Sequence, residues 1–152
     1  MQKITTYLWF DNQAEEAATL YTSLFEDSKL VEVHRQGEGS PAMMVTFELA
    51  GQRYLALNGG PGHDFSDAIS LFVDCEDQEE VDRLWGALTA DGGQEGPCGW
   101  LTDKYGVSWQ IIPKALPRLM SDPDPARAQR AMQAMRTMTK IDVKALEDAA
   151  RG

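Results

Sequence analysis

The chain reads Tyr7-Leu8-Trp9-Phe10-Asp11 near its start and Ser70-Leu71-Phe72-Val73-Asp74 near its middle. Both runs are rich in aromatic and aliphatic residues, which is typical of β-strands. Each is followed by a helical pattern that opens with an acidic pair, at residues 15–16 and 79–80. The apolar face of a sheet or of a helix must be buried against another element of the protein. The repetition therefore predicts two copies of one small strand–helix unit.

The first copy is expected to continue through three further strands. A strand over residues 3–10 leads to Asn12 and Glu15, which have the spacing of a capping box and predict the start of a helix. The later strands are expected at residues 29–36, 42–49 and 52–57. Asn58-Gly59-Gly60-Pro61-Gly62 is the strongest breaker in the chain and is predicted to end this copy.

The second copy repeats the plan and is followed by a different pattern. A strand over residues 68–74 precedes Asp77 and Glu80, a second capping box. The next segments are expected to form a helix to residue 91 and short strands at 94–95, 99–102 and 107–113. Asp124-Pro125 and Asp142 have the signals of two helix starts in a C-terminal tail.

Length and composition favour one compact domain. The 152 residues are expected to form a first module at 1–58, a linker at 59–62, a second module at 63–117 and a helical tail at 118–152. A formal net charge of -10 argues against binding to nucleic acid or to anionic lipid. No apolar run is long enough to cross a membrane, and the first residues lack the apolar stretch expected of a secretory signal. Cys75 and Cys98 are expected to be reduced thiols in a cytoplasmic protein.

A family resemblance is carried by segments spread along nearly the whole chain. They are 7–11 with 13–17, 55–61, 68–71, Cys98-Gly99-Trp100-Leu101-Thr102-Asp103-Lys104-Tyr105-Gly106-Val107-Ser108-Trp109-Gln110-Ile111, and 119–124. The chain resembles the vicinal-oxygen-chelate superfamily, which includes glyoxalase I, and within it the PhnB-like family often labelled 3-demethylubiquinone-9 3-methyltransferase. This resemblance implies an α+β fold. Two βαβββ modules would form curved mixed sheets with cup-shaped clefts, and homodimers would be common.

Enzymes of this superfamily generally hold a divalent metal between facing strands. The resemblance places the ligand positions near Ile4 or Thr6, near residues 55–58, at Ala68 or Ser70, and at Gln110. Gln110 is a plausible ligand and Asn58 a weaker one, but the other positions lack the imidazole and carboxylate donors that hold such ions. We therefore predict no cofactor and no metal site, with a divalent metal as the alternative.

Methyl transfer from S-adenosylmethionine is also not expected. That cofactor is usually held where a strand runs through a glycine-rich turn into a helix. Here the glycine-rich run at 59–62 precedes a strand, and Pro61 lacks a backbone donor.

The remaining prediction is a pocket lined by apolar and neutral polar side chains. Pockets for small ligands are mostly apolar with a few placed hydrogen-bonding groups. Gln110, Asn58 and Ser70 are expected to supply hydrogen bonds, and Trp9 and Trp100 to supply stacking surface. The other candidates are Phe47, Phe72 and Ser108. Trp9, Phe47 and Phe72 have the alternative role of core residues, and Trp109 is expected to pack beneath the helices.

We accordingly expect a homodimeric protein that binds a small neutral or aromatic molecule without a metal. Whether it is an enzyme stays open, because no complete catalytic or metal site can be recognised. One alternative is a metal-dependent lyase, isomerase or dioxygenase with Gln110 as a ligand. Another is a structural or interaction protein whose cups are filled by its own side chains.

Overall fold

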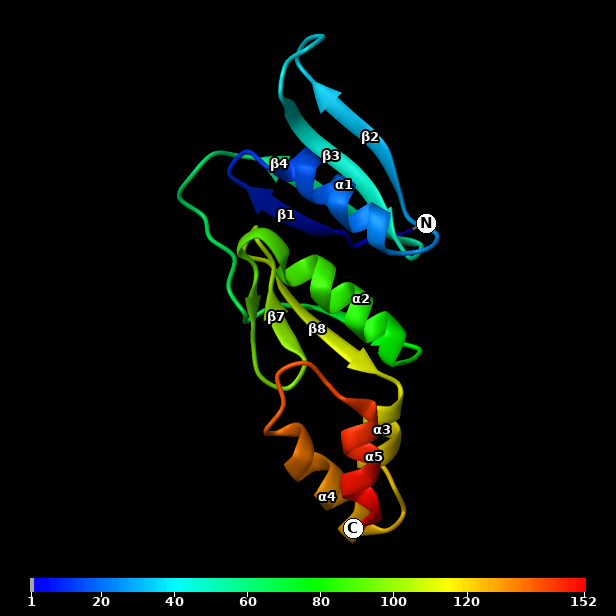
Figure 1. The fold of residues 1–152 in the computed structure, drawn as a ribbon. Helices are drawn as coiled ribbons and strands as arrows, with labels where there is room; N and C mark the ends of the chain where they lie inside the picture. The colour runs from blue at the N-terminus through cyan, green and yellow to red at the C-terminus, as the bar shows by residue number, and fades with distance from the viewer. Residues whose placement is uncertain (1) are drawn as a thin grey trace. The chain divides into compact units, whose positions relative to one another are not determined.

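The computed structural model describes residues 2–152, which divide into two compact units (Figure 1). The first unit extends to Asp64 and the second spans Phe65–Gly152. Each unit contains one four-stranded sheet with a helix on one of its faces. No helix in the described part of the chain is long and apolar enough to span a membrane.

The first unit has the order strand, helix and three strands. Its elements are β1 (Thr6–Phe10), α1 (Ala14–Leu24), β2 (Lys29–Arg35), β3 (Ala42–Leu49) and β4 (Gln52–Asn58). The strands lie in the order β1-β4-β3-β2, with β1 parallel to β4 and the other pairs antiparallel. This is one βαβββ module.

The second unit repeats this topology. Its elements are β5 (Leu71–Cys75), α2 (Gln78–Thr89), β6 (Gln94–Glu95), β7 (Trp100–Thr102) and β8 (Ser108–Pro113), with a short 3₁₀ turn at Ala90–Gly92. The sheet order is β5-β8-β7-β6, again with one parallel pair and two antiparallel pairs. The predicted α+β fold with two βαβββ modules is confirmed.

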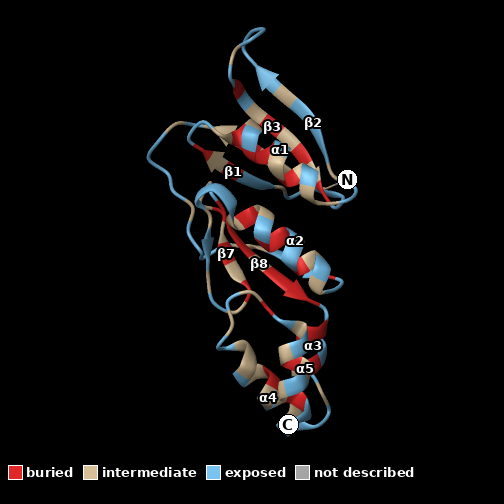
Figure 2. Cartoon of the chain, viewed as in Figure 1, coloured by how far each residue is buried: buried red, intermediate tan, exposed pale blue. Residues whose placement is uncertain are grey.

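Each sheet buries one face against its helix. In the first unit Phe47 stacks on Tyr54 with ring centroids 5.4 Å apart, beneath the small side chains of α1. In the second, α2 packs on β8, and Leu84 and Trp85 of the helix are buried together with Trp109 of the strand, which is 1% exposed. Figure 2 shows this burial as red along most of β8, while β2 is largely exposed. Trp109 therefore packs beneath the helix as predicted.

The two module helices are capped in different ways. The second begins as expected, since the Asp77 carboxylate accepts a 3.0 Å hydrogen bond from the Glu80 backbone N–H. The predicted capping box at Asn12 and Glu15 is wrong, because the N-cap residue is Gln13 and no local side chain caps α1. The Ala14 N–H instead donates to the Asn58 side-chain oxygen at 2.8 Å.

The C-terminal tail forms three helices that belong to the second unit. They are α3 (Ala115–Met120), α4 (Pro125–Met135) and α5 (Val143–Arg151). The predicted starts are confirmed, because Asp124 accepts from the Ala126 N–H and Asp142 from the Ala145 N–H.

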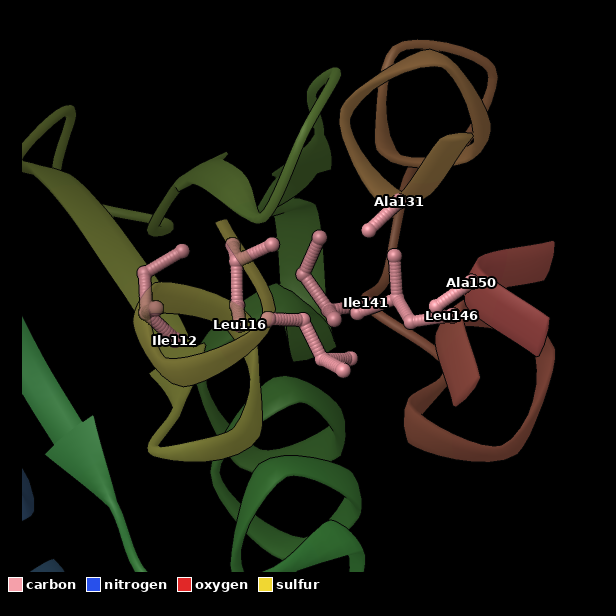
Figure 3. Packing of buried hydrophobic residues seen from close by; sticks show 7 residues of the cluster. Ile112, Leu116, Ala131, Ile141, Leu146 and Ala150 are labelled. Carbon is pink, nitrogen blue, oxygen red and sulfur yellow. The ribbon is translucent and has the colours of Figure 1, made fainter. Parts of the chain in front are cut away.

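A small apolar core joins this tail to the second sheet. Ile112 of β8 packs in one cluster with Leu116, Ile141 and Leu146, and Figure 3 shows these side chains facing one another. The Gln78 side chain on α2 adds two hydrogen bonds, to the Ile141 carbonyl and from the Val143 N–H. The tail is thus an integral part of the second unit.

Candidate functional site

One face of the second sheet is left open by α2. Side chains alternate between the two faces of a strand. Because Trp109 and Ile111 are buried on the helix side, Ser108 and Gln110 point to the opposite side. The strand register then completes a set that we name the open face: Ser70, Phe72, Trp100, Thr102, Ser108 and Gln110, of which Ser108 is buried with 4% of its surface exposed.

Gln110 stands at the centre of this open face. It is the register partner of Phe72 on one side and of Trp100 on the other, so an amide lies between two aromatic side chains. Phe72 is 59% exposed, which is unusual for a phenylalanine and makes its ring available for contact.

A hydrogen bond orients the Gln110 amide. Its Nε2 donates to Ser70 Oγ at 3.0 Å, across the gap between β8 and the residues that precede β5. Within the described part of the chain, the Gln110 Oε1 atom accepts no hydrogen bond and the Trp100 indole N–H donates none. The open face therefore offers an acceptor and a donor, both neutral, beside aromatic surface.

A groove of about 300 Å³ lies along one side of the open face. It includes Trp100, Thr102 and Ser108, but not Gln110, Ser70 or Phe72. The remaining lining residues are Asp67, Gln94, Glu95, Gly96, Pro97 and Leu101. Glu95 is held in place by a 2.6 Å hydrogen bond from the Trp85 indole. At the other end, Ile112 is covered by the tail, which limits how far the open face extends.

The predicted site residues of the first unit have structural roles. Asn58 uses its oxygen to cap α1, and its Nδ2 donates to the Ala42 carbonyl at 2.9 Å. Phe47 is 0% exposed and presents no surface to a ligand. These two residues therefore serve the core and the helix start.

Trp9 is enclosed by the segment that follows β4. Its indole N–H donates to the Gly60 carbonyl at 3.0 Å, and its ring meets the His63 ring edge-on at 4.5 Å. A Cβ atom at Gly59 would lie 2.3 Å from the indole, so only glycine fits there. Trp9 is thereby packed by its own loop.

The donor set of the open face does not fit a divalent metal. An amide and a hydroxyl stand where first-row ions need imidazole, thiolate or carboxylate ligands. Among residues 2–152, no group of three His, Cys, Asp or Glu side chains is arranged to hold a metal ion. Cys75 is also a poor ligand or nucleophile, because burial raises the pKa of its thiol to about 12.

Two features were missed by reasoning from the sequence. Thr102 and Asp67 line the groove, and only Thr102 could have been found, by alternation from Trp100. Asp103 was predicted to be part of a turn, but the residue is only 2% exposed and its carboxylate accepts hydrogen bonds from Val107 N–H and Trp109 Nε1. It organises the turn that places β8.

Comparisons with known proteins agree with this architecture. A family model described as 3-demethylubiquinone-9 3-methyltransferase matches residues 2–112. A solved structure described as a putative 3-demethylubiquinone-9 3-methyltransferase, PhnB protein, from Bacillus cereus is 38% identical, with a TM-score of 0.66. The alignment covers 74% of this chain and 99% of that protein.

A second solved structure shares the fold at lower identity. Protein PA1353 from Pseudomonas aeruginosa is 19% identical, has a TM-score of 0.60, and is aligned over 74% of this chain and 98% of its own. No curated protein matches the chain. The chain belongs, as its sequence predicted, to the PhnB-like family, whose family model bears the description 3-demethylubiquinone-9 3-methyltransferase.

Proposed function

We propose that the open face of the second sheet binds a small, neutral, aromatic molecule without a metal ion. The observation that carries this proposal is the row Phe72–Gln110–Trp100, with the amide held by Ser70. A planar ligand would stack against the exposed aromatic surface. It would also accept from the Trp100 N–H and donate to Gln110 Oε1.

Charge supports a neutral ligand. The hydrogen-bonding groups at the centre of the open face are an amide, a hydroxyl and an indole, none of which carries a charge. The groove beside them adds the carboxylates of Asp67 and Glu95 and no lysine or arginine, so an anion would be disfavoured. Neutral polar groups that lack partners reject a ligand that cannot pair with them.

The family description names methyl transfer, but the strand-to-helix turns favour binding over that chemistry. The turn from β1 to α1 consists of Asp11, Asn12 and Gln13, and the turn from β5 to α2 of Glu76 and Asp77. Neither contains the glycines that let a backbone approach a nucleotide cofactor. We therefore assign S-adenosylmethionine no role at these turns.

Homodimerisation is part of the same proposal. Tyr7 on the edge strand β1 is 49% exposed and Ile69, just before the edge strand β5, is 67% exposed, and both are large apolar side chains outside the proposed ligand site. A second copy of the chain would remove such surface from water. Light scattering after gel filtration would measure the mass, and a monomer at micromolar concentration would contradict this part.

The experiment is a ligand-observed NMR titration with four matched probes: benzamide, phenol, benzoate and benzylamine. We expect the two neutral probes to bind, and Gln110→Leu to weaken them about tenfold or more, since each tenfold is ~1.4 kcal/mol. Gln52→Leu makes the same exchange at an exposed strand position in the first unit and serves as the control. It should leave binding unchanged.

A chelator separates this proposal from metal-dependent chemistry. Binding should be the same with and without EDTA, and elemental analysis should find no stoichiometric metal that is lost in Gln110→Leu. A metal retained at about one per chain through Gln110 would instead make this a catalytic chelate site of the lyase, isomerase or dioxygenase type. Absence of binding by all four probes would favour the structural or interaction role.

A further inference from the structure

A second concave site lies in the C-terminal tail, away from the open face. A groove of about 660 Å³ is formed where α3, the loop after it, α4 and α5 meet. We name it the arginine groove and define it by its lining residues: Arg118, Leu119, Ser121, Asp122, Pro123, Arg127, Glu147 and Arg151. Its volume falls within the range of sites for small organic ligands.

Three guanidinium groups from three different helices line this groove. They are Arg118 of α3, Arg127 of α4 and Arg151 of α5, against two carboxylates, Asp122 and Glu147. The whole chain has 24 acidic and 14 basic side chains, so three arginines at one groove run against its composition, and their charge is balanced by Asp122, Glu147 and the neighbouring Asp148.

Most of the donors on these arginines are not used by the protein. Each guanidinium has five N–H groups. Arg127 Nε donates a hydrogen bond to Asp122 at 3.2 Å, and Arg151 Nη1 donates one to Asp148 at 2.8 Å. Arg118 makes no side-chain hydrogen bond within the described residues. The other donors are available to a ligand.

The carboxylate between two of the arginines is held loosely. Glu147 lies 3.5 Å from Arg118 and 3.9 Å from Arg151, beyond the length of a good charge-assisted hydrogen bond. Pairs between exposed side chains such as these contribute little to stability. An incoming anion could therefore take the place of Glu147 between the two guanidinium groups at small cost.

Asp122, by contrast, is fixed and positions Arg127. Its two oxygens accept from the Asp124 N–H at 2.9 Å and from Arg127 Nε at 3.2 Å. These two hydrogen bonds lower the pKa of Asp122 below its usual value, with the backbone contribution the larger. Arg127 is thus held through one edge while its terminal amino groups remain for another partner.

We propose that the arginine groove binds a small organic phosphate. Phosphate has the charge and the several acceptor oxygens that match bidentate guanidinium donors. Pro123, which is exposed, supplies apolar surface for the organic part of such a molecule. This site is independent of the open face and of the function proposed for it.

The test uses inorganic phosphate as the probe and follows amide NMR shifts of the intact protein at low ionic strength. We expect saturable shifts in the tail that chloride at matched ionic strength does not reproduce. The double variant Arg118→Gln/Arg151→Gln should weaken phosphate binding at least about tenfold. Arg136→Gln removes a positive charge at the C-terminal end of α4, outside the groove, and should change affinity less than about twofold.

Glu147→Gln protects the test from a folding artefact, because the expected result is a gain. Removing the internal carboxylate should strengthen phosphate binding about threefold or more, since no charge then competes for Arg118 and Arg151. Equal affinity in the native protein, the double variant and Glu147→Gln would overturn the proposal. So would shifts that chloride reproduces, which would mean charge screening alone.

Discussion

The two sheets have the same strand order and differ at the middle of the face that lies opposite the module helix. In the first unit Leu55 lies between Tyr7 and Thr46, whereas in the second Gln110 lies between Phe72 and Trp100. A leucine needs only contact, but an amide needs partners. The same backbone thus supports an aliphatic side chain at the centre of this face in one module and a hydrogen-bonding amide in the other.

The modules also differ in how they satisfy the start of their helices. Asn58 reaches α1 from the end of β4, while Asp77 caps α2 from the adjacent turn. The residue that corresponds to Asn58 by strand pairing is Pro113, which has no polar side chain: Asn58 pairs with Phe10 and Pro113 with Cys75. The two modules therefore share their topology but cap their helices with different polar contacts.

The largest effect is expected at Asp103, which has no counterpart in the tight Ala50-Gly51 turn of the first unit. Asp103→Ala should reduce the free energy of unfolding of the second unit by about 3 kcal/mol or more, because it leaves buried N–H donors unpaired. Urea unfolding measures this loss. Asp67→Ala, at an exposed position of the same unit, is the control, and a loss below about 1 kcal/mol for Asp103→Ala would contradict the assigned role.

Asn58 tests the difference in capping. Asn58→Ala should cost about 2 kcal/mol, since it removes the acceptor for Ala14 N–H and the donor to the Ala42 carbonyl. Hydrogen exchange should show the loss in the first unit. Asn12→Ala is the matched control at the cap position expected from sequence and should stay within about 0.5 kcal/mol. Equal costs at the two positions would restore Asn12 as the cap.

Cys75 gives the second unit a pH dependence that Phe10, at the corresponding strand position, cannot give the first. Burial raises its pKa from 9.0 to about 12, so the unfolded state loses this proton at lower pH than the folded state. The contribution to stability is complete below pH 9 and falls as the pH rises toward 12. Cys75→Ala should flatten this decline by at most ~1.4 kcal/mol per pH unit. Denaturant unfolding at several pH values measures this. If the free energy of unfolding falls as steeply with pH in Cys75→Ala as in the native protein, the thiol does not contribute.

Gln110→Leu sharpens the comparison of the open faces with the smallest effect on stability. It gives the second sheet the residue that Leu55 provides in the first, and it removes one hydrogen bond to Ser70. The free energy of unfolding should change by less than about 1 kcal/mol. Thermal unfolding measures it, and a larger loss would mean that Gln110 holds the fold and not a ligand.

The architecture was predictable because it follows from local patterns. Alternation along β3 and β8, breakers between strands, and the capping signals at Asp77, Asp124 and Asp142 all act within a few residues. The placement of Trp109 followed from the same alternation. Phe72, Gln110 and Trp100 were each predicted as ligand-binding residues. The strand register places them side by side in one row.

Two predicted ligand-binding residues of the first unit, Asn58 and Trp9, could not be assessed from sequence pattern alone. Asn58 and Trp9 have polar groups that could serve a ligand, but both are taken by the protein: Asn58 by α1 and β3, Trp9 by Gly60 and His63. These partners are distant in sequence or lie in an irregular loop. A pattern of residue types does not indicate which polar groups are already paired.

Two βαβββ modules, a helical tail and the family to which the chain belongs could all be predicted from the amino-acid sequence. Hydrophobic periodicity and helix capping depend on residues that are close in sequence, so both can be recognised without knowing the tertiary structure. Three features became visible only in the folded protein: Asn58 caps a helix, Asp103 is buried, and three arginines of the tail line one groove. Each of these depends on contacts between segments, whose hydrogen bonds and charges are set only when the elements pack.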